Sequence, residues 1–294
     1  MSSDPILLNG KMVSDVLEHQ YLRSQITTFK SAYNEDPTVA IVMIGENESC
    51  KKYTRMKRDA AERLGMRALN IDIPETYTER EITQSITNLN NFDDTHGVMI
   101  QHPVFEHFKD LERRFFDLID PRKDVDGLTS ANFSKLALNS NPIAFQPATA
   151  KGIITLLDFY GIDLQGSRVV VIGSSPILGL PLSMLMHHRG ATVSICNINT
   201  DFSYLNGLCL LADVVVGACG VPNLIYPTML KKDVILVDAG CCPGTEGVFQ
   251  SKCYERASYY TKPTGGIGPM TIYTLMSQVV QAAKESKRHE IYQG

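Results

Sequence analysis

The stretch that decides the fold is residues 169–179, which read VVVIGSSPILG. Four consecutive β-branched residues are typical of a strand buried on both faces of a parallel sheet. Gly173, Ser174 and Ser175 follow this strand and precede a predicted helix. Small residues there let the backbone approach a pyrophosphate, and the helix start offers free N–H groups. The spacing is not the usual Gly-x-Gly-x-x-Gly, so a plain strand–helix turn remains the alternative.

The same alternation of strands and helices extends outward in both directions. Towards the C-terminus, a helix is predicted over about residues 176–189, with strands at 192–196, 214–217 and 234–238. Towards the N-terminus, strands are predicted at 39–44, 69–73 and 97–101, with helices over about 48–64 and 82–89. A helix over about 149–160 connects the halves, and a last helix has its apolar face between residues 272 and 283. Repeated strand–helix–strand units predict an α/β fold with parallel sheets.

The composition excludes several classes of protein. A length of 294 residues allows two modest domains, and a net charge of −4 argues against a nucleic-acid or membrane-surface binder. No signal peptide and no membrane-spanning run is evident. The seven cysteines are dispersed without a Cys-x-x-Cys pair. We therefore expect reduced thiols, no metal site and a cytoplasmic location.

Three segments of the first half carry candidate functional side chains. Tyr53 and Lys57 lie four residues apart on a predicted helix and so share a face, although most such pairs are solvated. Gln101 ends a predicted buried strand, where an amide needs a partner or a ligand. Asp126 lies in a KDVDG loop, for which turn chemistry is the simpler explanation. Ligands bind at the carboxyl ends of parallel strands, which favours a shared site.

A further segment, residues 265–271, reads GGIGPMT and comes directly before the last helix. A proline at a helix start explains an ordinary helix entry. Three glycines in four residues exceed what that entry needs, and close approach to a ligand would explain the surplus.

Together these segments resemble the bifunctional methylenetetrahydrofolate dehydrogenase/cyclohydrolase family. The resemblance runs from about residue 8 to the last helix, and its markers are Tyr53-x-x-x-Lys57, Gln101-x-Pro103, residues 123–127 (KDVDG), residues 147–152 (PATAKG), the turn at 173–181 and residues 265–271. It implies an N-terminal α/β catalytic domain (1–147 plus 276–294), a Rossmann-like parallel-sheet dinucleotide domain (148–275) and a folate site in the cleft between them. It also implies oxidation of 5,10-methylenetetrahydrofolate with NAD(P)+ and hydrolysis of the methenyl product to 10-formyltetrahydrofolate.

The resemblance further implies residue roles and partners. Lys57 would be the cyclohydrolase acid/base, Gln101 its hydrogen-bonding partner and Asp126 the group that holds the pterin. The partners would be tetrahydrofolate derivatives and a second copy in a homodimer, with no nucleic acid and no membrane. The substrate-binding residues would be Tyr53, Pro103, Pro263, Gly265 and Gly266. The cofactor-binding residues would be Thr149, Gly173, Ser174, Ser175, Ile177, Asn197, Ile198, Gly220 and Cys241.

The proposed hydrolysis places a demand on Lys57. A lysine can accept a proton from water only if its pKa falls from about 10.4 towards neutrality. Burial and a cationic substrate both act in that direction. A carboxylate beside the amine would act against it, whereas the amide of Gln101 would not.

Several positions depart from the family pattern. Ser174 stands where an arginine usually grips the 2′-phosphate of NADP, and Asn197-Ile198 replaces the usual His-Ser. The family default is NADP, but these changes admit NAD. Cys50 and His102 also differ from the usual residues. The alternatives are therefore an enzyme with only one of the two activities, or a catalytically silent folate-binding paralogue.

Overall fold

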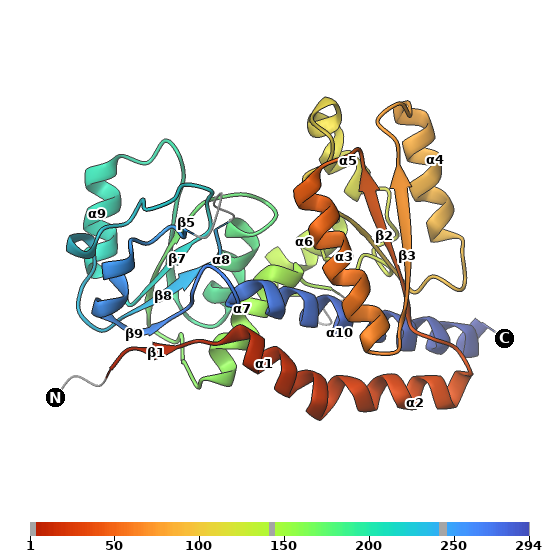
Figure 1. Ribbon diagram of the computed structural model, residues 1–294, viewed down its shortest axis with the longest axis horizontal. Helices are drawn as coiled ribbons and strands as arrows, with labels where there is room; N and C mark the ends of the chain where they lie inside the picture. Colours follow the sequence, from red (N-terminus) through yellow and green to blue (C-terminus); the bar gives the residue numbers. More distant parts are fainter. Residues whose placement is uncertain (1–3, 141–144, 241–245, 294) are drawn as a thin grey trace. The chain divides into compact units, whose positions relative to one another are not determined.

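The computed structural model describes residues 4–140, 145–240 and 246–293. The chain divides into two compact units, each built around one parallel sheet (Figure 1). The six-stranded unit comprises Met1–Val16 and Thr149–Thr271, and the three-stranded unit comprises Leu17–Ala148 and Ile272–Gly294. The expected α/β fold is confirmed. We expected residues 1–16 in the N-terminal domain, but they group with the six-stranded unit. The reason is that Ile6 and Leu7 pair in parallel with Tyr259 and Tyr260.

The sheet of the six-stranded unit has the strand order β1-β9-β8-β7-β5-β6, with every neighbouring pair parallel. The chain runs from β5 to β6 on one side and then crosses to β7 on the other. The order therefore reverses at β5, and such a point is where open α/β sheets bind ligands. The strands are β1 (Ile6–Leu7), β5 (Arg168–Ile172), β6 (Thr192–Cys196), β7 (Val214–Gly217), β8 (Val234–Asp238) and β9 (Ala257–Tyr260); the helices are α7 (Ala148–Phe159), α8 (Gly179–His188) and α9 (Phe202–Leu211).

The three-stranded unit has the order β3-β2-β4, again all parallel. All seven residues of β2 are buried, as expected for a central strand with both faces covered. Figure 1 shows α3 and α4 on either side of β2 and β3. The strands are β2 (Thr38–Ile44), β3 (Arg67–Ile73) and β4 (Gly97–Ile100); the helices are α1 (Gly10–Leu17), whose last residue belongs to this unit, α2 (Arg23–Tyr33), α3 (Glu48–Arg63), α4 (Glu79–Asn90), α5 (Glu112–Phe116) and α6 (Ser130–Ala137).

Local sequence explains where the helices of this unit begin and end. Thr78 and Glu81 form a capping box at the start of α4. Gly65, two residues after the end of α3, has a φ of +77°, which is the left-handed conformation that ends a helix and favours glycine. A π-helical turn over Glu18–Leu22 joins α1 to α2.

The last helix, α10 (Ile267–Gln293), supplies much of the core of the three-stranded unit. Leu275, Met276, Val279 and Val280 are fully buried in one cluster with residues of β2 and β4. Burying each such side chain contributes roughly 1.5–3 kcal/mol. This packing provides the partner surface that the apolar face of the helix requires.

Candidate active site

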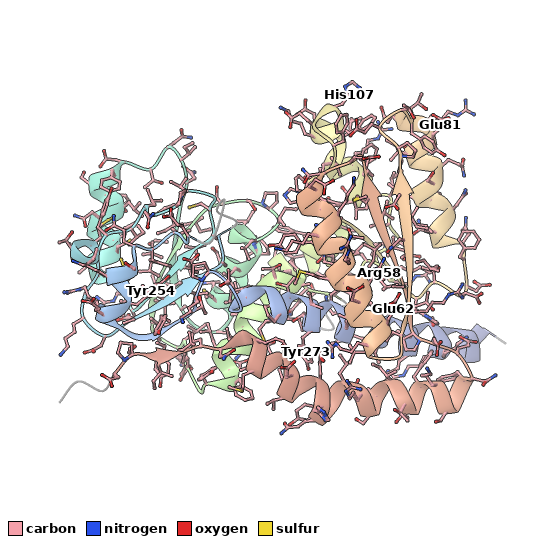
Figure 2. All side chains as sticks on the ribbon, viewed as in Figure 1. Arg58, Glu62, Glu81, His107, Tyr254 and Tyr273 are labelled. Atoms are coloured by element: carbon pink, nitrogen blue, oxygen red, sulfur yellow. The ribbon has the colours of Figure 1, made fainter. Side chains whose placement is uncertain are left out.

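Helix α3 presents two different faces. Arg58 and Glu62 form an ion pair at 3.8 Å on its outer side, where both side chains point away from the sheet (Figure 2). Lys57 lies on the inner side and is only 8 % exposed. Because an isolated charge in such a place is costly, Lys57 needs a hydrogen-bonding partner or a lowered pKa.

Gln101 is that partner. It directly follows β4, it is 7 % exposed, and its Oε1 accepts a hydrogen bond from Lys57 Nζ at 2.9 Å. Gln101 Nε2 donates to the carbonyl oxygen of His102 at 2.8 Å. Since the NH₂ group is occupied by that carbonyl, the amide must turn its oxygen towards the lysine. The structure therefore brings together two of the three expected catalytic residues.

The surroundings of Lys57 change its protonation. Burial lowers the pKa of Lys57, and this effect outweighs the charges of Asp126 and Cys50, which raise it. Asp126 is thus a carboxylate whose charge acts against the lowered pKa of the amine, but burial has the larger effect. The net direction still agrees with a lysine that can accept a proton near neutral pH.

Asp126 is the third expected catalytic residue. Burial raises the pKa of its carboxyl, while the charges of Lys57 and His102 act in the opposite direction. Its backbone is held in place, because its carbonyl oxygen accepts from Ala148 N at 3.2 Å. Gln278 on α10 also donates to the carbonyl oxygens of the preceding Val125 at 2.7 Å and of Gln146 at 3.0 Å. No local pattern predicts this role for Gln278, which lies about 150 residues after Asp126.

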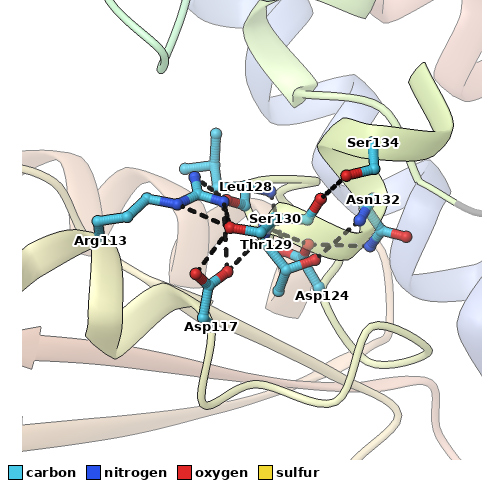
Figure 3. A network of polar contacts seen from close by, with 8 residues as sticks. All are labelled: Arg113, Asp117, Asp124, Leu128, Thr129, Ser130, Asn132 and Ser134. Carbon is cyan, nitrogen blue, oxygen red and sulfur yellow. Dashed lines mark hydrogen bonds and ion pairs between the residues drawn. The ribbon is translucent and has the colours of Figure 1, made fainter. Parts of the chain in front are cut away.

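The other aspartate of the KDVDG loop is structural. Asp124 is 1 % exposed and accepts hydrogen bonds from the backbone N–H groups of Leu128 and Thr129 and from Asn132 Nδ2, at 3.1, 2.8 and 2.9 Å (Figure 3). These bonds tie the loop to the start of α6. The motif thus divides its roles, with Asp124 holding the loop and Asp126 lying beside Lys57.

Glu112 holds the segment that follows Gln101. Its Oε1 accepts hydrogen bonds from Val104 N at 2.9 Å and His102 Nδ1 at 2.8 Å. Cys50 Sγ lies 3.4 Å from the Pro103 carbonyl oxygen, and the His102–Pro103 peptide is cis. His102 therefore has a protein partner. Sequence reasoning missed Glu112 because no motif marks it.

Tyr53 and Pro103, two of the residues expected to bind substrate, are exposed. Tyr53 is 43 % exposed and lies one turn before Lys57 on α3, and Pro103 is exposed two residues after Gln101. Both therefore neighbour the Lys57–Gln101 pair along the chain. Their roles stay predictions.

The glycines before α10 have reasons within the chain. Gly265 has a φ of +77°, and its carbonyl oxygen accepts from Lys11 N at 3.1 Å. A Cβ on Gly266 would lie 2.6 Å from the Lys262 carbonyl oxygen, closer than real contacts allow. Backbone conformation and packing explain both glycines, so the expected ligand contact there, like that of Pro263, stays a prediction.

The turn after β5 is tightly built from backbone. Gly173 has a φ of +123°, and a Cβ there would lie 2.2 Å from the carbonyl oxygen of Ala218 after β7. Ser175 Oγ accepts from Ile177 N at 3.2 Å and Leu178 N at 3.3 Å, and this bonded turn delays the start of α8 to Gly179. Within the described residues, no group accepts the backbone N–H groups of Ser174 and Ser175. Free N–H donors ahead of a helix fit a diphosphate.

The other predicted cofactor residues follow neighbouring strands. Asn197 and Ile198 are exposed directly after β6, and Gly220 is exposed after β7. Because β5, β6 and β7 are parallel, these residues and Gly173 lie at the same edge of the sheet. Thr149, on α7, accepts a hydrogen bond from Thr271 Oγ1 at 3.3 Å. Cys241 lies outside the described residues.

Within residues 4–140, 145–240 and 246–293, no three His, Cys, Asp or Glu side chains gather in a way that could bind a metal ion. The same residues include no helix with the length and apolar character that a membrane crossing requires.

Comparison with known proteins places this geometry in a family. The sequence profile of the tetrahydrofolate dehydrogenase/cyclohydrolase catalytic domain matches residues 8–126, and that of the NAD(P)-binding domain of the same enzymes matches residues 147–287. The bifunctional protein FolD of Cellvibrio japonicus is 38% identical over 284 residues, covering 96% of this chain and 99% of that protein.

Solved structures agree with this relationship. The bifunctional FolD enzyme of Campylobacter jejuni has 33% identity and a TM-score of 0.88, with coverage of 95% of this chain and 98% of that one. A 5,10-methylenetetrahydrofolate dehydrogenase from the silkworm Bombyx mori has 31% identity and a TM-score of 0.90, with coverage of 97% and 99%. The chain belongs to the tetrahydrofolate dehydrogenase/cyclohydrolase family.

Proposed function

We propose that this protein oxidises 5,10-methylenetetrahydrofolate with a nicotinamide dinucleotide and hydrolyses the resulting methenyl compound to 10-formyltetrahydrofolate. One observation carries the proposal. In a member of this family, the buried amine of Lys57 donates to Gln101 at 2.9 Å, and its pKa is lowered by burial. A buried amine with a lowered pKa suits proton transfer. Without such a role, burying the amine would only reduce the stability of the protein.

The first reaction needs positioning more than it needs a base. When bound, the nicotinamide accepts a hydride from the methylene carbon. Tyr53 and Asp126 would orient the folate, Tyr53 by packing against its ring system and Asp126 by accepting hydrogen bonds from the pterin. The free N–H groups of Ser174 and Ser175 would hold the diphosphate. By family default the dinucleotide is NADP, with NAD as the alternative.

The second reaction needs Lys57 itself. Water attacks the methenyl carbon, and the neutral amine of Lys57 takes a proton from that water as the C–O bond forms. Lys57 then returns the proton to N5 as the carbon–N5 bond breaks, and the hydroxyl proton leaves to solvent. Gln101 keeps the amine in place throughout. Because its amide is neutral, Gln101 adds no negative charge that would raise the pKa of Lys57.

The test compares two lysines of the same helix. Lys57→Met should leave hydride transfer within a few-fold of wild type but slow methenyl hydrolysis roughly 100-fold or more, so that the methenyl absorbance accumulates. Lys52→Met, at an exposed position of α3, should change neither rate. Wild-type hydrolysis by Lys57→Met would refute the proposed role. A wild-type protein with one activity or none would support the corresponding alternative.

We also propose a homodimer in the cytoplasm. Strand β6 is at the edge of its sheet, and its Ile195 side chain is 42 % exposed. An unpaired edge with an exposed apolar side chain suits pairing with a second copy. The five cysteines among the described residues form no disulfide with one another, as is usual in reducing compartments. Sedimentation analysis would contradict the dimer by showing a monomer at micromolar concentration.

A further inference from the structure

The loops after β5, β6 and β7, which would receive the adenosine end of the dinucleotide, contain no positively charged side chain. In this kind of fold the residue that ends the second strand, some 20 residues after the glycine turn, reads the adenosine ribose. Here that residue is Asn197, after β6. Residues 173–178, 197–200 and 218–223, which follow β5, β6 and β7, contain no lysine, arginine or histidine.

The arginines and lysines near the ends of these strands lie at the opposite edge of the sheet. Arg168 begins β5 and forms an ion pair at 3.1 Å with Asp213, the residue just before β7. Lys231 also forms an ion pair with Asp213. Arg189 follows α8 and pairs with Asp158 at 2.7 Å. Lys262 does follow a strand at the carboxyl edge, but that strand is β9, which is separated from β5 by β7 and β8.

The side chains that do follow β5 and β6 are small and neutral. Ser174 is exposed, and its hydroxyl makes no hydrogen bond within the described part of the chain. Asn197 Oδ1 accepts from Asn199 N at 2.9 Å, and Thr200 Oγ1 accepts from Asn197 N at 2.9 Å, so this loop is already ordered. The one charged neighbour, Asp201, is an anion whose pKa is lowered by its hydrogen bond from Ser203.

A 2′-phosphate would therefore find no favourable partner. It carries close to two negative charges at neutral pH, and proteins hold it with an arginine. Hydroxyl and amide groups can still bond the two ribose hydroxyls of the unphosphorylated cofactor. We infer that this protein is selective for NAD over NADP, and that Ser174 and Asn197 are the residues that set this preference. The inference rests on the proposed function and narrows its cofactor to one form.

The test measures binding directly, so it does not depend on turnover. Calorimetric titration of the purified full-length protein should give a Kd for NAD+ at least tenfold below that for NADP+, about 1.4 kcal/mol. Adenosine 5′-phosphate should likewise bind more tightly than adenosine 2′,5′-bisphosphate, which isolates the adenosine end.

Matched variants locate the preference. Ser174→Arg should tighten NADP+ binding roughly tenfold or more, since a charge-assisted bond replaces a neutral one, and leave NAD+ within a few-fold. Gln165→Arg adds the same charge in the exposed loop before β5, at the opposite edge, and should change neither affinity.

The outcomes separate the two proposals. Wild-type binding of NADP+ as tight as that of NAD+, or a Ser174→Arg variant with unchanged NADP+ affinity, would overturn the preference and leave the proposed function standing. Binding of neither dinucleotide would instead count against the proposed function.

Discussion

Lys57 on α3 and Gln101 at the end of β4 are joined by a 2.9 Å hydrogen bond in which the amide oxygen faces the amine. An amide accepts this bond without adding charge, so the lowering of the lysine pKa by burial survives. The pair thus combines fixed geometry with an amine whose pKa is lowered by burial.

Gln101→Glu should impair the hydrolysis through charge alone. A carboxylate at this position raises the pKa of Lys57, so less of the amine is neutral at pH 7. We expect the hydrolysis rate at pH 7 to fall roughly tenfold or more, and the rising limb of the pH–rate profile to move to higher pH. The measurement is methenyl hydrolysis followed by absorbance from pH 6 to pH 10. Gln84→Glu, on the exposed side of α4, is the control, and an unmoved profile for Gln101→Glu would contradict the argument.

Stability should depend on pH through Lys57. Its pKa in the folded protein lies below the ordinary 10.5. At pH values between the folded pKa and 10.5, the unfolded chain therefore binds more protons than the folded chain. Stability therefore rises with pH across that window, and burial of the charged amine costs stability below it. Relative to wild type, Lys57→Met should thus be most stable at low pH and lose this advantage as pH approaches 10. Urea unfolding of both proteins at pH 7 and pH 10 checks this. A stability advantage of Lys57→Met that grows with pH would contradict the lowered pKa of Lys57.

Glu112 should matter to the hydrolysis although it lies outside the motifs. Glu112→Ala leaves Val104 N and His102 Nδ1 without their acceptor and frees the segment that fixes the amide of Gln101. We expect a loss of about 1–3 kcal/mol in stability and a several-fold slower hydrolysis. Glu112→Gln keeps one acceptor oxygen and should recover most of both. Glu106→Ala, an exposed residue of the preceding 3₁₀ turn, should have little effect on either. Equal losses of stability and hydrolysis rate in Glu112→Ala and Glu106→Ala would show that Glu112 does not hold the segment after Gln101.

Asp124 should prove more important for stability than an exposed aspartate. Asp124→Ala removes the acceptor of two buried backbone N–H groups and of the Asn132 amide. We expect a loss of about 2–4 kcal/mol by urea unfolding, against less than about 0.5 kcal/mol for the exposed Asp110→Ala. A loss from Asp124→Ala as small as that from the control would mean that its hydrogen bonds are dispensable.

Local pattern predicts the fold well where period and length are clear. The run ending at Ile172 is β5, and α3 occupies the expected residues up to its glycine cap. Helix α9 was not predicted, because its apolar residues lie all around the helix and form no single periodic face. Asp201, whose side chain accepts from Tyr204 N, is the capping signal that could have revealed it.

The residues of the candidate site could be predicted from the sequence only where they belong to a motif. Lys57, Gln101 and Asp126 are each marked by a strand end, a helical spacing or a loop. Glu112 and Gln278 act through contacts with distant parts of the sequence, and no local pattern records such contacts. Side chains that hold a site in place are therefore the harder part to read from a sequence.

The position of α10 affects how the protein can be made. Its residues from Ile272 onward belong to the unit that otherwise ends at Ala148. During synthesis on the ribosome, that earlier segment emerges without the helix that buries Val39 and Met99. The unit translated first must wait for the final residues before its interior can close, so nascent chains stalled after Thr271 should be vulnerable to chaperone capture and proteolysis.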